Sequence, residues 1–155
     1  SDMAVALTAL DAKVETQSGA GEARVLAMEG FHRLPGDTPH IETELRQAEM
    51  ITAVVLPPPP QGGQIYRKAR ERASYAFAIG SVAVAGGKVA LGAVAHKPWR
   101  AEAAELALEQ GASPAEAMAA ELKGARPDGH NDFKLKLMAR LGAACLTTTG
   151  AGDDQ

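Results

Sequence analysis

The spacing of apolar residues changes along the chain from the period of strands to the period of helices. Residues 12–17 and 22–28 have the composition and alternation of strands, and the turn-forming residues 18–21 separate them. Residues 31–45 contain a Pro-Gly-Asp turn signal and are predicted to be a loop. Residues 49–57 form a further apolar stretch that ends at the first of four consecutive prolines. This part of the chain therefore predicts a hairpin and one more strand.

A helix is predicted before this hairpin. Ser1 is a suitable N-cap for residues 2–11. On such a helix Met3, Leu7 and Leu10 share one face, which we expect to be buried.

A second hairpin is predicted around Gly86 and Gly87, which separate two apolar, alternating runs. If these glycines form the whole loop, the opposing pairs are Ala85 with Lys88, Val82 with Leu91, Ile79 with Val94, and Phe77 with His96. One face then carries Val82, Val84, Val89 and Leu91, and the other carries Phe77, Ile79 and Val94. Because both faces are apolar, both must be covered. With a strand at residues 63–70, an antiparallel sheet of three strands is predicted within residues 64–96.

Three helices are predicted after this sheet and packed against it. Residues 98–110 start at a proline and end before a glycine, and residues 113–124 begin with a capping box of Ser113 and Glu116. The third helix, residues 131–146, has an apolar stripe made of Phe133, Leu137, Leu141 and Cys145, with Met138 beside it.

The fold class predicted from this order is α+β. The proline run and the glycines after it mark a linker at residues 58–63, between a unit at 1–57 and a second unit at 64–146. The second unit is the three-stranded antiparallel sheet packed with a three-helix bundle. The polar tail, residues 147–155, is predicted to be disordered.

Composition and charge exclude several function classes. The chain has 155 residues and a net charge of −3, whereas a duplex-binding domain is usually basic, so we expect no nucleic-acid binding. No stretch approaches the ~20 apolar residues of a membrane span, so no membrane insertion is expected. A soluble protein of the cytoplasm or periplasm fits this composition. Aromatic residues make up only 4%, which predicts a core of closely approaching backbones.

The residues that usually carry chemistry are sparse. Cys145 is the single cysteine, and the four histidines are far apart without helical ligand spacing, so no metal site is expected. No set of nucleophile, base and orienting carboxylate can be assembled, so no catalytic residue is assigned. Glu102, Glu105, Glu116 and Glu121 have solvent-facing helical spacing. The chain also lacks both G-x-G-x-x-G and G-x-x-x-x-G-K-[ST].

The remaining feature is a basic run that contains Arg67, Lys68, Arg70 and Arg72. Clustered guanidinium groups usually face an anion. Two explanations are equally supported by composition: internal ion pairs with Glu71 and with Glu42, Glu44 and Glu49, or the edge of a bound anion or cofactor.

Three segments resemble a known family. Residues 66–84, 89–105 and 130–141 are similar to the C-terminal domain of the FAD-binding (medium) subunit of molybdenum hydroxylases. This family includes the xanthine dehydrogenases, the aldehyde oxidoreductases and the carbon monoxide dehydrogenases, whose flavoproteins share this C-terminal domain. Residues 1–57 resemble the end of the preceding FAD-binding domain. The resemblance runs in order from residue 1 to about residue 146.

The resemblance implies an electron-transfer role. In the family, a large subunit with molybdopterin hydroxylates an aldehyde or a heteroaromatic ring, a small subunit carries iron–sulfur clusters, and the medium subunit passes electrons through FAD to an acceptor. The FAD-binding roles carried over by position are those of Asp2 at the ribityl chain, Ile51 against the isoalloxazine, and Lys68 at the pyrimidine edge of the ring. Arg67 takes the last role if the register shifts by one.

The resemblance also implies that this chain carries only part of a flavin site, because the glycine-rich segments that hold the FAD pyrophosphate in the family have no match here. The isolated chain is expected to oxidise neither aldehyde nor xanthine and to bind FAD weakly or not at all. Two alternatives stay open: a structural domain that docks against the other subunits without binding flavin, and an independent anion or nucleic-acid binder.

Overall fold

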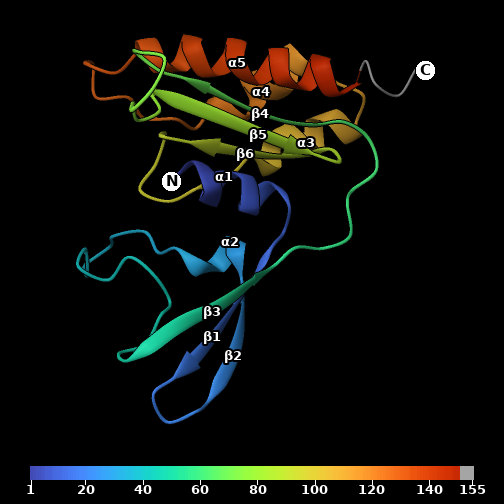
Figure 1. Cartoon of the computed structure of the whole chain (residues 1–155). Helices are drawn as coiled ribbons and strands as arrows, with labels where there is room; N and C mark the ends of the chain where they lie inside the picture. Colours follow the sequence, from blue (N-terminus) through green and yellow to red (C-terminus); the bar gives the residue numbers. More distant parts are fainter. Residues whose placement is uncertain (151–155) are drawn as a thin grey trace.

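A computed structural model describes residues 1–150 of the chain, which fold into two bodies with helix α1 between them (Figure 1). The first body contains a sheet of order β2-β1-β3, and the second contains a sheet of order β4-β5-β6-β7. All strand pairs are antiparallel. The sheets are antiparallel, and most of the strands precede the three C-terminal helices in the chain. This arrangement confirms the predicted α+β class.

The first sheet is formed by β1 (Lys13–Ser18), β2 (Ala23–Ala27) and β3 (Glu49–Val55). The predicted hairpin is confirmed, with β1 and β2 paired from Lys13 opposite Ala27 to Gln17 opposite Ala23. Between β2 and β3 lie the short helix α2 (Met28–Phe31) and a long connection that contains one isolated bridge, His32 to Thr43.

The second sheet has four strands rather than the three predicted: β4 (Gln64–Ala69), β5 (Gly80–Ala85), β6 (Lys88–Gly92) and β7 (Trp99–Arg100). The glycine turn and its register are confirmed, because Ala85 opposes Lys88 and Val82 opposes Leu91. Gly86 and Gly87 have φ values of 55° and 82°, the positive φ that a two-residue turn of this type requires.

The predicted hairpin was too long. The β5–β6 ladder ends at Ser81 opposite Gly92, so the expected pairs of Ile79 with Val94 and of Phe77 with His96 are not formed. A side chain at position 92 would collide with Ser81 and with Val5 of α1, which explains why the strand ends in a glycine where the helix approaches closely.

Both faces of the second sheet are covered, as predicted. Val82, Val84, Val89 and Leu91 pack against the C-terminal helices. The opposite face is different from the prediction, because it consists of Ala83, Ala85 and Ala90 packed against Val5 and Ala9 of α1. Phe77 was assigned to this face, but its side chain is 99% exposed because its segment is a loop.

The helices that cover the sheet are α3 (Glu102–Glu109), α4 (Pro114–Leu122) and α5 (Phe133–Gly150). The capping box of Ser113 and Glu116 is confirmed. Helix α3 starts later than predicted, because Trp99 belongs to β7 and pairs there with Leu91 of β6. Two of the glutamates that were predicted to face solvent do not. The Glu105 side chain is 18% exposed and pairs with Arg100. Glu121 accepts hydrogen bonds from Nε1 of Trp99 and from two backbone N–H groups at the start of α3.

Helix α5 buries Met138, Gly142, Cys145 and Leu146. The predicted stripe is therefore correct at Cys145 and wrong at Phe133, which is 56% exposed. Gly142 lies on the buried stripe because Met118 of α4 occupies the space that a side chain would need. Residues 147–150, predicted to be disordered, continue α5, and residues 151–155 of the predicted tail lie outside the described residues.

Helix α1 (Asp2–Ala9) has Ser1 as its N-cap, as predicted. The predicted apolar face is correct in part: Leu7 and Leu10 are partly buried against the two cores, but Met3 is 70% exposed. The fully buried residues are smaller ones such as Ala4, Thr8 and Ala9. Small side chains fit here because α1 is packed on two sides, with Ala4 against the core of the first body and Val5 against the second sheet. The division into units at residues 58–63 stays a prediction, and α1 packs against both of them.

Candidate functional site

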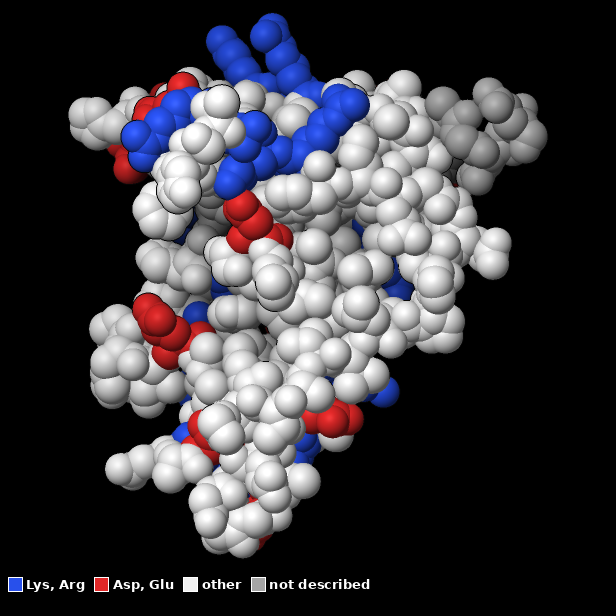
Figure 2. Space-filling model, in the orientation of Figure 1, with Lys and Arg blue, Asp and Glu red and all other residues white. Residues whose placement is uncertain are grey.

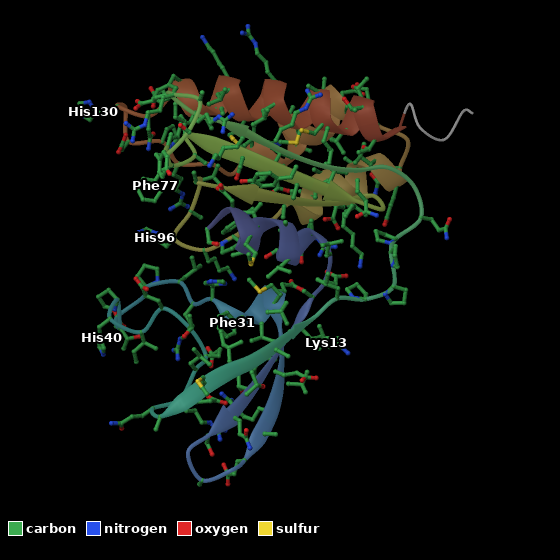
Figure 3. All side chains as sticks on the ribbon, viewed as in Figure 1. Lys13, Phe31, His40, Phe77, His96 and His130 are labelled. Carbon is green, nitrogen blue, oxygen red and sulfur yellow. The ribbon has the colours of Figure 1, made fainter. Side chains whose placement is uncertain are left out.

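A cleft of about 770 Å³ lies where α1 begins. It is lined by residues 1–5, by residues 75–78 of the loop before β5, and by residues of the loop between β6 and β7. His32 and Lys68 also line it, so the walls come from both bodies. Figure 3 shows Phe77 and His96 on this side of the molecule.

Lys68 and Asp2 meet in this cleft. Nζ of Lys68 donates to Oδ2 of Asp2 at 2.6 Å and to the carbonyl oxygen of Ala76 at 3.1 Å. The Lys68 side chain is only 19% exposed, whereas that of Asp2 is 47% exposed. The hydrogen bond from Lys68 lowers the pKa of the Asp2 carboxyl group. This contact ties together α1, β4 and the loop before β5.

The alternation of β4 determines which basic residue reaches the cleft. Lys68 opposes Ser81, whose side chain lies on the α1 side of the sheet near Gly92. Arg67 opposes Val82, which packs on the other side against the C-terminal helices. On that side, burial raises the pKa of the Cys145 thiol on α5, and the positive charge of Arg67 partly offsets this increase. The two candidate positions for one basic role thus lie on opposite faces of the sheet.

Ile51 is separate from this pair. It lies on β3 of the first sheet opposite Thr16, with 42% of its surface exposed, and it does not line the cleft. The structure therefore brings Asp2 and Lys68 together and leaves Ile51 apart from them.

Residues at the cleft and beside it were missed from the sequence. Tyr66 does not line the cleft, but it is on the same face of β4 as Lys68. Burial raises the pKa of its hydroxyl group, Ser81 opposes that rise, and Asp2 adds to it. Strand alternation could have identified Tyr66. His32 and Lys97 carry no local signal, because the connections that hold them approach α1 only in the folded chain.

The ion-pair explanation for the basic run is largely wrong. Its proposed partner Glu49 instead pairs with Arg24, and Glu44 pairs with Arg33. Within residues 1–150, Lys68 is the one member of the run with an ion pair, while Arg72 donates to the carbonyl oxygen of Tyr75 in its own loop. Figure 2 shows Lys and Arg side chains gathered along the edge where α5 lies.

No group of three or more His, Cys, Asp or Glu side chains is placed to hold a metal ion within residues 1–150. No helix in the same range combines the length and the hydropathy needed to span a bilayer.

Comparisons with known proteins agree on one class of protein. Residues 1–59 match the family described as FAD binding domain in molybdopterin dehydrogenase. The aldehyde oxidoreductase FAD-binding subunit PaoB of Escherichia coli K12 is 50% identical over 156 residues, which cover 97% of this chain and 48% of PaoB. The chain thus spans about half the length of this curated relative.

A solved structure shares the fold. A chain of carbon monoxide dehydrogenase from Hydrogenophaga pseudoflava, in a form that lacks the Mo-pyranopterin moiety of the molybdenum cofactor, superposes with a TM-score of 0.77. The match covers 97% of this chain and 59% of that chain at 23% identity, which supports the architecture alone.

Proposed function

Because this chain is homologous to the FAD-binding subunits of molybdenum hydroxylases, we propose that it supplies part of the flavin site of an electron-transfer subunit. The complete assembly would contain a small iron–sulfur subunit and a large molybdopterin subunit, and it would oxidise an aldehyde or a xanthine-type heterocycle. FAD suits the last step because it accepts electrons singly from clusters and releases them in pairs.

The cleft fits the ring and ribityl portions of a flavin. Its volume of about 770 Å³ is that of a small-molecule site. Within it, the ammonium group of Lys68 supplies a cation that favours negative charge at the pyrimidine edge of a reduced ring. The Asp2 carboxylate supplies an acceptor for ribityl hydroxyl groups. Ile51 would add apolar contact from the first sheet.

The observation that carries the proposal is the 2.6 Å contact between Lys68 Nζ and Asp2 Oδ2 inside a cleft whose walls come from both bodies. Asp2 and Lys68 are 66 positions apart in the sequence, and folding brings their side chains into contact. The pyrophosphate of FAD needs backbone N–H contacts of the kind that glycine-rich motifs supply, and this sequence contains neither of the two common motifs.

The test is a titration with FAD and with riboflavin 5′-phosphate, followed by flavin fluorescence. We expect weak binding that Lys68→Met weakens by roughly tenfold or more, the loss expected when a charge-assisted hydrogen bond is removed. Arg67→Met is the matched control, since it removes a cation one residue away on the opposite face of β4. Equal losses in both variants would contradict the assignment of Lys68, and submicromolar FAD binding would show that this half-site is sufficient alone.

A docking domain without a flavin role is the second candidate. It is favoured by Tyr75 and Phe77, whose side chains are 93% and 99% exposed in one loop, as expected of residues that contact a partner subunit. This candidate predicts that Lys68→Met leaves flavin binding unchanged.

A further inference from the structure

His32 lies at the cleft and is not assigned a role by the flavin site described above. It follows α2, and its backbone bridges to Thr43 across the long connection of the first body. Its ring packs edge-on against Phe31, with 5.1 Å between the ring centroids and 85° between the ring planes. Phe31 belongs to the buried core of the first body, so the imidazole is anchored to a fixed element.

The two ring nitrogens of His32 are in different surroundings. Within residues 1–150, Nδ1 is the one buried side-chain nitrogen or oxygen atom without a hydrogen-bond partner. Nε2 is not among these buried, unpartnered atoms and has no hydrogen bond within the described residues, so part of its surface is open. Because His32 lines the cleft, we infer that this open edge of the ring adjoins the cleft.

This asymmetry selects one form of the ring. A proton on Nδ1 would be a buried N–H group without an acceptor, whereas an unprotonated Nδ1 leaves a lone pair without a donor. Buried N–H groups without a partner are rarer in proteins than under-satisfied acceptors, which favours the unprotonated Nδ1. Burial lowers the pKa of His32, the charges of the chain's amino group and of Lys97 lower it further, and Glu42 opposes them. The ring is therefore neutral at neutral pH with its proton on Nε2.

We propose that His32 is a hydrogen-bond donor of the cleft, which presents Nε2–H to an acceptor atom on the ring or the ribityl chain of a flavin. The inference rests on the proposed function, because it takes the ligand class from there. His32 completes a set of three polar groups from three elements: the carboxylate of Asp2, the ammonium group of Lys68 and the imidazole of His32. Unlike the other two, it belongs to the first body, and its ring has no hydrogen-bond partner within residues 1–150.

The first test needs no ligand. Long-range ¹H–¹⁵N correlation spectra of the ¹⁵N-labelled chain report both nitrogens of each histidine and distinguish the two neutral tautomers from the imidazolium. We expect His32 at pH 7 to be neutral and protonated at Nε2. A proton on Nδ1, in either the other tautomer or the charged ring, would overturn the inference.

The second test adds riboflavin 5′-phosphate at millimolar concentration to the same sample. We expect the His32 nitrogen signals to move, and those of His40 and His130, which do not line the cleft, to stay in place. If flavin binds in a Lys68-dependent manner while the His32 signals stay unchanged, the inference fails and the proposed function stands. If no residue of the cleft responds, both fail.

Two variants separate the donor from the ring. His32→Phe keeps an aromatic ring beside Phe31 and removes the N–H group, and we expect it to weaken flavin binding by roughly three- to tenfold. His32→Gln places an amide N–H group near the Nε2 position and should recover part of that affinity. Equal affinity for His32→Phe and the unaltered chain, with the fold confirmed by the spectra of the other histidines, would overturn the inference.

Discussion

Every residue of β5 is buried, whereas β3 has exposed side chains at five of its seven positions. β5 is a central strand with a neighbour on each side, and both of its faces are covered by helices. β3 is an edge strand of a sheet whose small core lies around Val14, Met28 and Phe31. A strand is therefore buried or exposed according to its position in the sheet and the helices that cover it.

A polar network supports the first sheet where its apolar core ends. The Glu49 side chain is 1% exposed, and its two oxygens accept hydrogen bonds from Arg24 at 2.8 and 2.6 Å. Thr16 and the backbone N–H of Arg46 donate to the same carboxylate. The first sheet is therefore expected to depend on charge and pH, and the second on apolar packing.

The largest expected effect tests the packing half of this comparison. Leu91→Ala removes a side chain of β6 that is 1% exposed and packs against the C-terminal helices, and it should reduce the free energy of unfolding by about 2–5 kcal/mol. Val54→Ala on β3 is the control, since Val54 is 43% exposed and should lose well under that amount. Urea denaturation measures both. Similar losses would mean that the two sheets are equally packed.

The second prediction concerns acid. Arg24, then Thr16 and the backbone of Arg46, lower the pKa of Glu49 from 4.5 to about 2. Because the folded pKa lies below the unfolded one, this contribution to stability is complete above about pH 4.5 and is lost as the pH falls towards 2.

Glu49→Gln should therefore lower the urea midpoint at pH 7 and show a smaller further decrease between pH 5 and pH 2 than the unaltered chain. The loss should be smaller than that of Leu91→Ala. Glu22→Gln is the control, because the Glu22 side chain is 74% exposed and its ion pair with Arg46 is 4.0 Å long. Identical pH profiles for Glu49→Gln and the unaltered chain would contradict a stabilising role of the network.

The parts of the fold that depend on neighbouring residues could be predicted from the sequence, and those that depend on distant residues could not. The glycine turn and the capping box at Ser113 were predicted correctly because the residues that form them are adjacent in the chain. The partners of Glu49 were not, because Arg24 is 25 residues away and any of several basic residues fits equally well by composition. The buried face of α1 was predicted correctly at Leu7 and Leu10 and wrongly at Met3, because the packing of this helix on two sides exists only in the folded chain.

The same limit applies to the candidate site. The choice between Lys68 and Arg67 was left open, although strand alternation in β4 places them on opposite faces. The contact of Lys68 with Asp2, 66 residues away, could not be derived from spacing. The family resemblance implied only that each of these residues lies at a flavin. His32 had no signal in the sequence, because the exposure of its two nitrogens is a property of the folded cleft.

A third, smaller effect concerns local structure in the second body. Oγ of Ser113 accepts from the backbone N–H of Glu116 at 3.3 Å, and the Glu116 carboxylate accepts from the backbone N–H of Ser113 at 2.9 Å. Ser113→Ala should lower the free energy of unfolding by about 1 kcal/mol, and Ser113→Asp should retain most of it. Thermal unfolding followed by circular dichroism measures the difference. A loss as large as that of Leu91→Ala would mean that this body depends on caps as much as on its core.

The smallest expected effect on stability is at Ile51, and there it separates structure from function. Because Ile51 is 42% exposed on an edge strand, Ile51→Ser should change the free energy of unfolding by only about 0.5 kcal/mol. If a flavin ring covers that exposed surface, the same variant should weaken the binding of riboflavin 5′-phosphate by about fivefold, which corresponds to about 1 kcal/mol of lost apolar burial.

Val54→Ser is the matched control, since Val54 is on the same strand and equally exposed, with no role implied by the resemblance. Fluorescence titration of both variants decides the matter. If both lose affinity equally, β3 contributes only general apolar surface; if neither does, the flavin contact belongs to the cleft of Asp2 and Lys68 and the first sheet takes no part in it through Ile51.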